Sequence, residues 1–98
     1  METFDYFVFI HFGYSLDYDE LDDQIDFFEI RKPEFKNDLL VELEAVMESG
    51  NYEIARKILK EAGRILSKRA TEEFIRYLYY RLKGKKPRLT LEQLMEIR

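Results

Sequence analysis

The fold class is decided by residues 35–66, which read FKNDLLVELEAVMESGNYEIARKILKEAGRIL. Over residues 35–48 the apolar side chains recur at steps of three and four, the period of one face of an α-helix. A second stripe with this period covers residues 54–66, and its opposite face is basic. The Ser-Gly-Asn of residues 49–51 is small and polar, which suits the end of one helix and a tight turn. The stretch predicts two amphipathic helices joined as a hairpin.

Helical periodicity continues toward the C-terminus. Residues 74–82 carry another apolar stripe, for which Thr71 is a suitable N-cap. The pattern leaves open whether residues 67–70 are a bend or the middle of one long helix. Thr90 with Gln93 three residues later is a capping-box signature and predicts a short last helix.

The N-terminal third fits two structures. Residues 4–12 alternate as in a strand, and their aromatic content favours a strand, yet they also form one helical face. Residues 19–31 have helical spacing with acids in the first turn. Because no second convincing strand is present, we predict an all-α, single-domain bundle of about five helices over residues 1–98. The alternative is an α+β domain with a small antiparallel hairpin of residues 3–12 and 24–31.

Length and composition exclude several classes of protein. A chain of 98 residues forms one small core, and the absence of Cys excludes disulfides and thiolate metal sites. The longest stretch without Asp, Glu, Lys or Arg is eleven residues, 6–16, whereas a membrane helix needs about 20. We therefore expect no membrane association and a cytoplasmic location.

Charge is divided unevenly along the chain. Residues 1–49 contain 14 acidic and three basic side chains, whereas residues 50–98 contain six acidic and 13 basic ones. Such asymmetry indicates either an electrostatic partner or two faces that neutralise each other inside the fold.

The inventory of reactive side chains predicts no enzyme, cofactor or metal. The only histidine, His11, lies in an aromatic run without a nearby serine, so we expect it in the core or at its rim. Seven carboxylates fall within residues 17–29, but they lack the ligand spacing of a calcium loop.

We predict instead that this acidic segment binds a protein partner, since it attracts a basic surface and carries aromatic side chains that suit an interface. The predicted partner-binding residues are Tyr14, Asp17, Tyr18, Asp19, Glu20, Asp22, Asp23, Asp26 and Glu29. Solvation alone is the competing interpretation.

A nucleic-acid partner is the second hypothesis. Arg56, Lys60, Arg64 and Lys68 follow helical spacing, as a phosphate-binding face requires. The acidic half of the chain would repel phosphate, so nucleic-acid binding is not the expected function.

Several segments resemble immunity proteins of bacterial contact-dependent growth inhibition systems. They are an aromatic start at residues 7–12, Gly13-Tyr14, and the sequence LDYD of residues 16–19 leading into an acidic helix that ends at Phe27-Phe28. The likeness covers residues 6–48 and 88–98, while residues 50–86 depart from it.

The resemblance implies a cytoplasmic protein, without catalytic activity, that binds and blocks a cognate toxin domain, often a nuclease. An acidic domain with protruding aromatic side chains can cover a basic nuclease cleft, which agrees with this implication. A phage or viral accessory protein that mimics nucleic acid to inhibit a host defence protein is an alternative.

Overall fold

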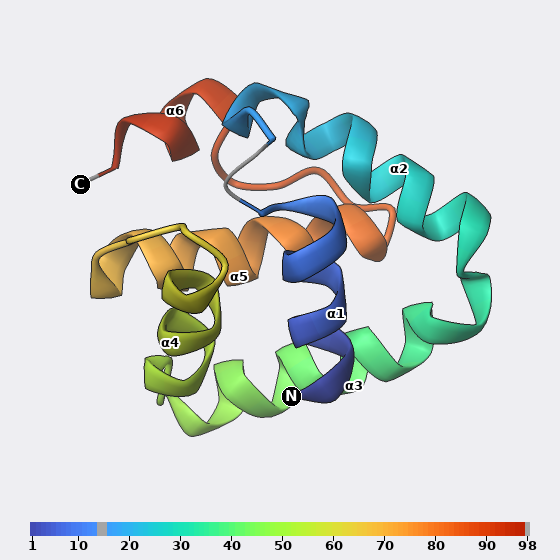
Figure 1. Cartoon of the computed structure of the whole chain (residues 1–98), viewed down its shortest axis with the longest axis horizontal. Helices are drawn as coiled ribbons and strands as arrows, with labels where there is room; N and C mark the ends of the chain where they lie inside the picture. Colours follow the sequence, from blue (N-terminus) through green and yellow to red (C-terminus); the bar gives the residue numbers. More distant parts are fainter. Residues whose placement is uncertain (14–15, 98) are drawn as a thin grey trace.

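The computed structural model describes residues 1–13 and 16–97, and these residues contain six α-helices and one short 3₁₀ helix (Figure 1). The elements are α1 (Glu2–His11), η1 (Tyr18–Glu20), α2 (Leu21–Arg31), α3 (Pro33–Ser49), α4 (Glu53–Glu61), α5 (Lys68–Leu82) and α6 (Leu91–Glu96). These residues contain no strand, so the all-α prediction is confirmed, with six α-helices rather than about five. The alternative N-terminal hairpin is wrong, because both of its proposed strands are helical.

Helix α1 lies at the centre of the fold and contacts α2, α3 and α4 (Figure 1). Its buried side chains, Phe4, Phe7, Val8 and His11, follow helical spacing. Phe74 of α5 stacks on Phe12, just beyond the end of α1, with ring centroids 4.8 Å apart. A helix therefore buries the N-terminal aromatics on several neighbours at once, while a strand here would lack a pairing partner.

The N-terminus of α1 is capped by a side chain from α3. Met1, at the N-cap position, makes no side-chain cap. The Glu42 carboxylate instead accepts hydrogen bonds from the backbone N–H groups of Thr3, at 3.0 Å, and Phe4, at 2.9 Å. A negative charge at this end also complements the helix dipole.

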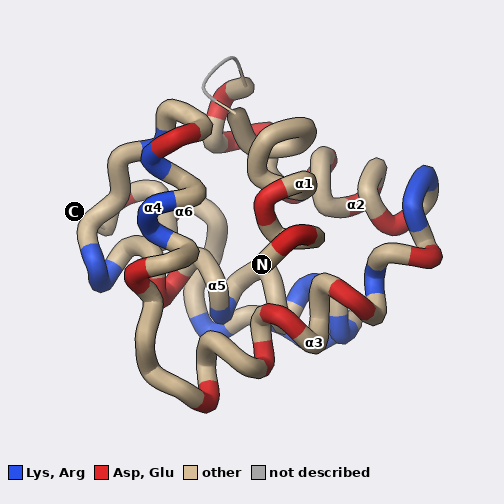
Figure 2. The backbone as a smooth tube through the Cα atoms, turned by 60° about the horizontal axis from the view of Figure 1, so that its bottom comes forward, with Lys and Arg blue, Asp and Glu red and all other residues tan. Residues whose placement is uncertain are grey.

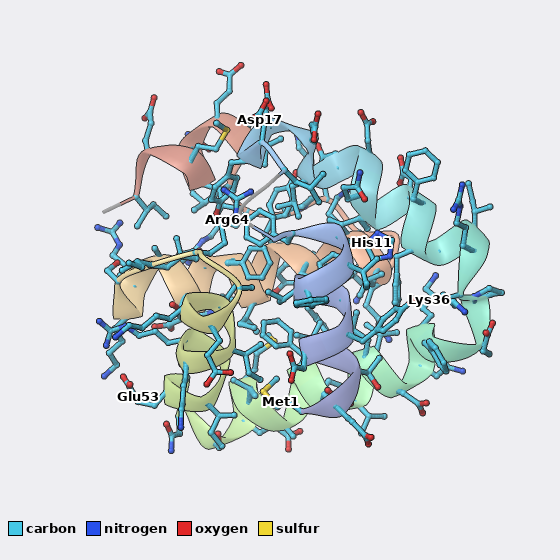
Figure 3. The ribbon with its side chains drawn as sticks, viewed as in Figure 1. Met1, His11, Asp17, Lys36, Glu53 and Arg64 are labelled. Carbon is cyan, nitrogen blue, oxygen red and sulfur yellow. The ribbon has the colours of Figure 1, made fainter. Side chains whose placement is uncertain are left out.

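The C-terminal end of α1 is capped by Arg64, from the segment after α4 (Figure 3). The guanidinium donates to the carbonyl oxygens of Phe12, at 3.0 Å, and Gly13, at 3.2 Å, and also to that of Leu16. Its central carbon lies 4.4 Å from the centroid of the Phe12 ring. Desolvation lowers the pKa of Arg64, which is the electrostatic cost of placing the cation here.

The hairpin of α3 and α4 is confirmed, but α4 is shorter than its apolar stripe. Gly50 ends α3 with a φ of 70°, a left-handed conformation that glycine adopts without strain. Helix α4 ends at Glu61, and Gly63 has a φ of 92°. The predicted stripe to Leu66 therefore runs past the helix into an irregular segment.

Residues 62–67 separate α4 from α5, so two helices are present and residues 68–70 form the first turn of the second one. The Ser67 side chain accepts a hydrogen bond from Ala70 N at 3.0 Å and is the N-cap. The prediction of Thr71 as the cap is wrong, since Thr71 is buried within α5 and its hydroxyl donates to Ser67 O at 2.8 Å. The capping box of Thr90 and Gln93 is confirmed at α6.

No helix among the described residues combines the length and apolar character that crossing a membrane requires.

We predict that Arg64→Lys lowers the free energy of unfolding by about 2 kcal/mol, because an ammonium lacks the planar fork of five donors with which the guanidinium reaches its partly buried carbonyls and lies over the Phe12 ring. Arg64→Met should cost at least as much. Urea unfolding of the purified proteins measures both effects. Arg69→Lys, at an exposed position on α5, is the control and should change stability little. Equal stability of Arg64→Lys and the wild type would contradict the capping role.

Candidate protein-binding surface

Helix α2 presents three different faces, each formed by residues at positions i, i+4 and i+7. The first face is apolar and fully buried, as its spacing predicted. It consists of Leu21, Ile25 and Phe28. This face fixes the rotation of α2 about its axis, and the other two faces follow from it.

The second face is acidic and forms ion pairs within the fold. Arg81 of α5 places its Nη2 3.2 Å from Asp26 Oδ1 and its Nε 3.3 Å from Asp22 Oδ1. The Nε contact lacks hydrogen-bond geometry. The Tyr77 hydroxyl donates to Asp22 Oδ1 at 2.5 Å, and burial together with this bond raises the pKa of Tyr77. Asp22 and Asp26 are therefore partly neutralised by α5.

Glu29 completes this second face. Its carboxylate pairs with Lys36 Nζ of α3 at 2.8 Å. Three of the seven predicted acidic residues thus hold α2 against its neighbours. Ion pairs inside the fold therefore neutralise part of the acidic half of the chain, which was one of the two interpretations of the charge asymmetry.

The third face points outward and mixes acidic and apolar side chains. Phe27 is 46% exposed and Ile30 76% exposed, and both follow Asp23 on the same side of α2. Asp19 and Glu20 of η1 are exposed immediately before it. None of these three carboxylates forms an ion pair with another residue that the structure describes. We call Asp19, Glu20, Asp23, Phe27 and Ile30 the acidic–apolar face.

Phe27 and Ile30 are surface residues that were not among the predicted partner-binding residues. A signal was available, because successive residues of a helix point about 100° apart, so Phe27 and Phe28 cannot both face the core. Ile30 likewise falls outside the buried spacing of α2. The Arg31 guanidinium lies 5.5 Å from the Phe27 ring centroid and borders the face with one positive charge.

Tyr18 is positioned differently from the expected protruding anchor. Its ring packs edge-on against Phe12, with centroids 4.9 Å apart, and lies 5.7 Å from the Arg64 guanidinium. Burial raises the pKa of Tyr18 to about 12. Asp17 next to it is exposed, and Tyr14 lies outside the described residues.

The predicted basic helix face is not continuous. Arg64 is turned toward the end of α1, and Lys68 belongs to α5 rather than α4. Arg56 donates from Nε to Leu66 O at 3.0 Å. Lys57 and Lys60 remain as exposed cations on α4.

His11 belongs to the aromatic core, as its sequence context predicted. It is 7% exposed, stacks on Phe7 and meets Phe28 edge-on. Its Nδ1 lies 3.0 Å from Gln24 Oε1. Among the residues that the structure describes, no three His, Asp or Glu side chains are grouped so that they could hold a metal ion.

No family model matches the chain, and comparisons with curated proteins and with solved structures found no match.

We predict that Tyr18→Phe makes the protein less sensitive to alkaline pH. The pKa of Tyr18 is raised from 10.0 to about 12 in the folded protein. The stability associated with its neutral phenol is therefore fully present below pH 10.0 and is lost as the pH rises toward about 12. The free energy of unfolding, measured in urea between these values, should fall less steeply for Tyr18→Phe. Parallel curves for variant and wild type would contradict the prediction.

Proposed function

We propose that this protein is a non-enzymatic immunity protein that binds and neutralises a cognate toxin domain of the nuclease type. The contact would be made by the acidic–apolar face. The observation that carries the proposal is the composition of this face, in which exposed acids without described ion-pair partners stand beside exposed Phe27 and Ile30.

The two kinds of side chain on this face have different physical roles. Carboxylates attract a basic surface over a distance and raise the rate of association. Apolar side chains that become buried at the centre of an interface slow dissociation. Because α2 is anchored by its buried face and by Arg81, it presents Asp23, Phe27 and Ile30 together on its outward side.

Only part of the predicted partner-binding site belongs to the proposed contact with the toxin. Asp22, Asp26 and Glu29 have internal partners, so we assign them to positioning α2 rather than to contact with the toxin. The partial burial of Tyr18 supports a positioning role for this residue as well.

The burial of His11 supports the absence of catalytic turnover, since the only imidazole is enclosed by aromatic rings. Arg64 and Arg56 donate hydrogen bonds to backbone carbonyls of the fold, which makes nucleic-acid binding by a basic helix the less favoured alternative. A nucleic-acid mimic that inhibits a defence protein would use the same acidic–apolar face, so the identity of the partner distinguishes it from an immunity protein.

The expected partner is a basic toxin domain encoded beside this protein. Co-expression should protect the host from that domain, and the two proteins should purify together. A partner that is instead a nucleic-acid-binding defence protein would favour mimicry. Submicromolar binding of nucleic acid by the purified protein at physiological salt would contradict the inhibitor function.

Kinetic measurements with the partner test the face itself. Asp19→Lys/Asp23→Lys should slow association about tenfold or more and reduce its salt dependence. Phe27→Ala and Ile30→Ala should mainly speed dissociation, at a cost of about 1–3 kcal/mol each.

The matched control is Asp38→Lys/Glu48→Lys, which makes the same change in net charge at exposed positions of α3. It should bind nearly as the wild type does. If the substitutions on α2 and η1 leave the binding kinetics unchanged, the interface lies on another part of the surface.

A further inference from the structure

A groove of about 540 Å³ lies between α4 and the segment that follows it. Two of the most exposed apolar side chains of the fold line it, Ile54 at 59% and Ile65 at 79%. We call it the basic–apolar groove and define it by Glu53, Ile54, Arg56, Lys57, Lys60, Ile65 and Leu66.

The lining of the groove is predominantly positive. It contains three cations and one carboxylate, and Arg56 already lies 3.6 Å from that carboxylate, Glu53. Lys57 and Lys60 are exposed and form no ion pair with any described residue. Exposed isoleucines beside lysines are the chemical complement of the acidic–apolar face.

The groove and the acidic–apolar face lie on opposite sides of α1. In Figure 1, α4 lies to the left of α1 and α2 to its upper right, and Figure 2 shows the same order from another direction. Figure 2 also shows basic positions on α4 and acidic positions on α2. The two surfaces are therefore separated within one molecule, and they can meet only between two molecules.

We propose that the basic–apolar groove of one copy binds the acidic–apolar face of a second copy. The lengths match, since Asp23 to Ile30 spans about 10 Å of helix and Ile54 to Lys60 about 9 Å. A helix α2 laid along α4 would bring acids to Lys57 and Lys60, while its apolar residues would cover the isoleucines.

This contact is heterologous, because it joins two different surfaces. A pair of molecules therefore leaves one basic–apolar groove and one acidic–apolar face unoccupied. The contact is also small, since five residues on one side and seven on the other are far fewer than the roughly 20–30 a side of a stable interface, so association should be weak and reversible. A dissociation constant of about 0.1 mM is the expected order of magnitude. The proposal goes beyond the immunity function and does not rest on it, since it needs no toxin.

Sedimentation of the full chain tests the proposal. The average mass of the wild type should rise above the monomer value of 11.9 kDa with increasing concentration. It should return to that value in about 0.5 M NaCl, where charges are screened within a few ångströms. Wild-type protein that stays monomeric at about 1 mM would overturn the proposal.

Two charge-reversed variants identify the surfaces. Lys57→Glu/Lys60→Glu removes the cations of the groove, and Asp19→Lys/Asp23→Lys removes the acids of the face. Each variant alone should remain monomeric, with association weakened at least tenfold. A mixture of the two should associate again, because each variant retains the surface that the other has lost.

The matched controls are Lys85→Glu/Lys86→Glu and Asp38→Lys/Glu48→Lys, which change charge at exposed positions outside both surfaces. Each should self-associate like the wild type. Loss of association in these controls, or no recovery in the mixture of the two test variants, would overturn the proposal. Monomeric protein that binds vesicles of anionic phospholipid through Lys57 and Lys60 would overturn it in favour of a lipid occupant.

Discussion

Helix α1 is stabilised at both ends by charged side chains that belong to other elements. Glu42 of α3 accepts hydrogen bonds at its N-terminus, and Arg64 donates to the carbonyls at and beyond its C-terminus. Both charges have the sign that complements the helix dipole. Because α1 packs on α2, α3 and α4, these two contacts tie the central helix to the rest of the bundle.

Arg64 also bonds residues at the end of α1 and a residue that precedes η1. The guanidinium bonds the carbonyls of Phe12, Gly13 and Leu16 and stands over the rings of Phe12 and Tyr18. Its position follows from the early end of α4 at Glu61, which places residue 64 in an irregular segment. Helical spacing had predicted Arg64 on a nucleic-acid-binding face. In the structure Arg64 instead caps α1 and contacts the ring of Tyr18 in η1.

The orientation of α2 determines which acidic side chains form ion pairs within the fold and which remain free on the surface. Its spacing alone predicts the buried face of Leu21, Ile25 and Phe28. One of the two remaining faces is neutralised by ion pairs with Arg81, which is distant in sequence, and with Lys36. The face left without such partners is the surface for which we propose binding of a basic protein, and its complement on α4 is the one for which we propose association between copies.

The sequence by itself determined the helical hairpin of α3 and α4, the turn at Gly50, the capping box at Thr90 and the place of His11 among aromatic side chains. These features depend on local periodicity and on backbone conformations that particular residues favour. Tertiary structure alone decided that residues 2–11 are helical, because aromatic side chains suit either period and the caps come from α3 and the segment after α4. It also decided which acids remain exposed, because their partners come from other helices.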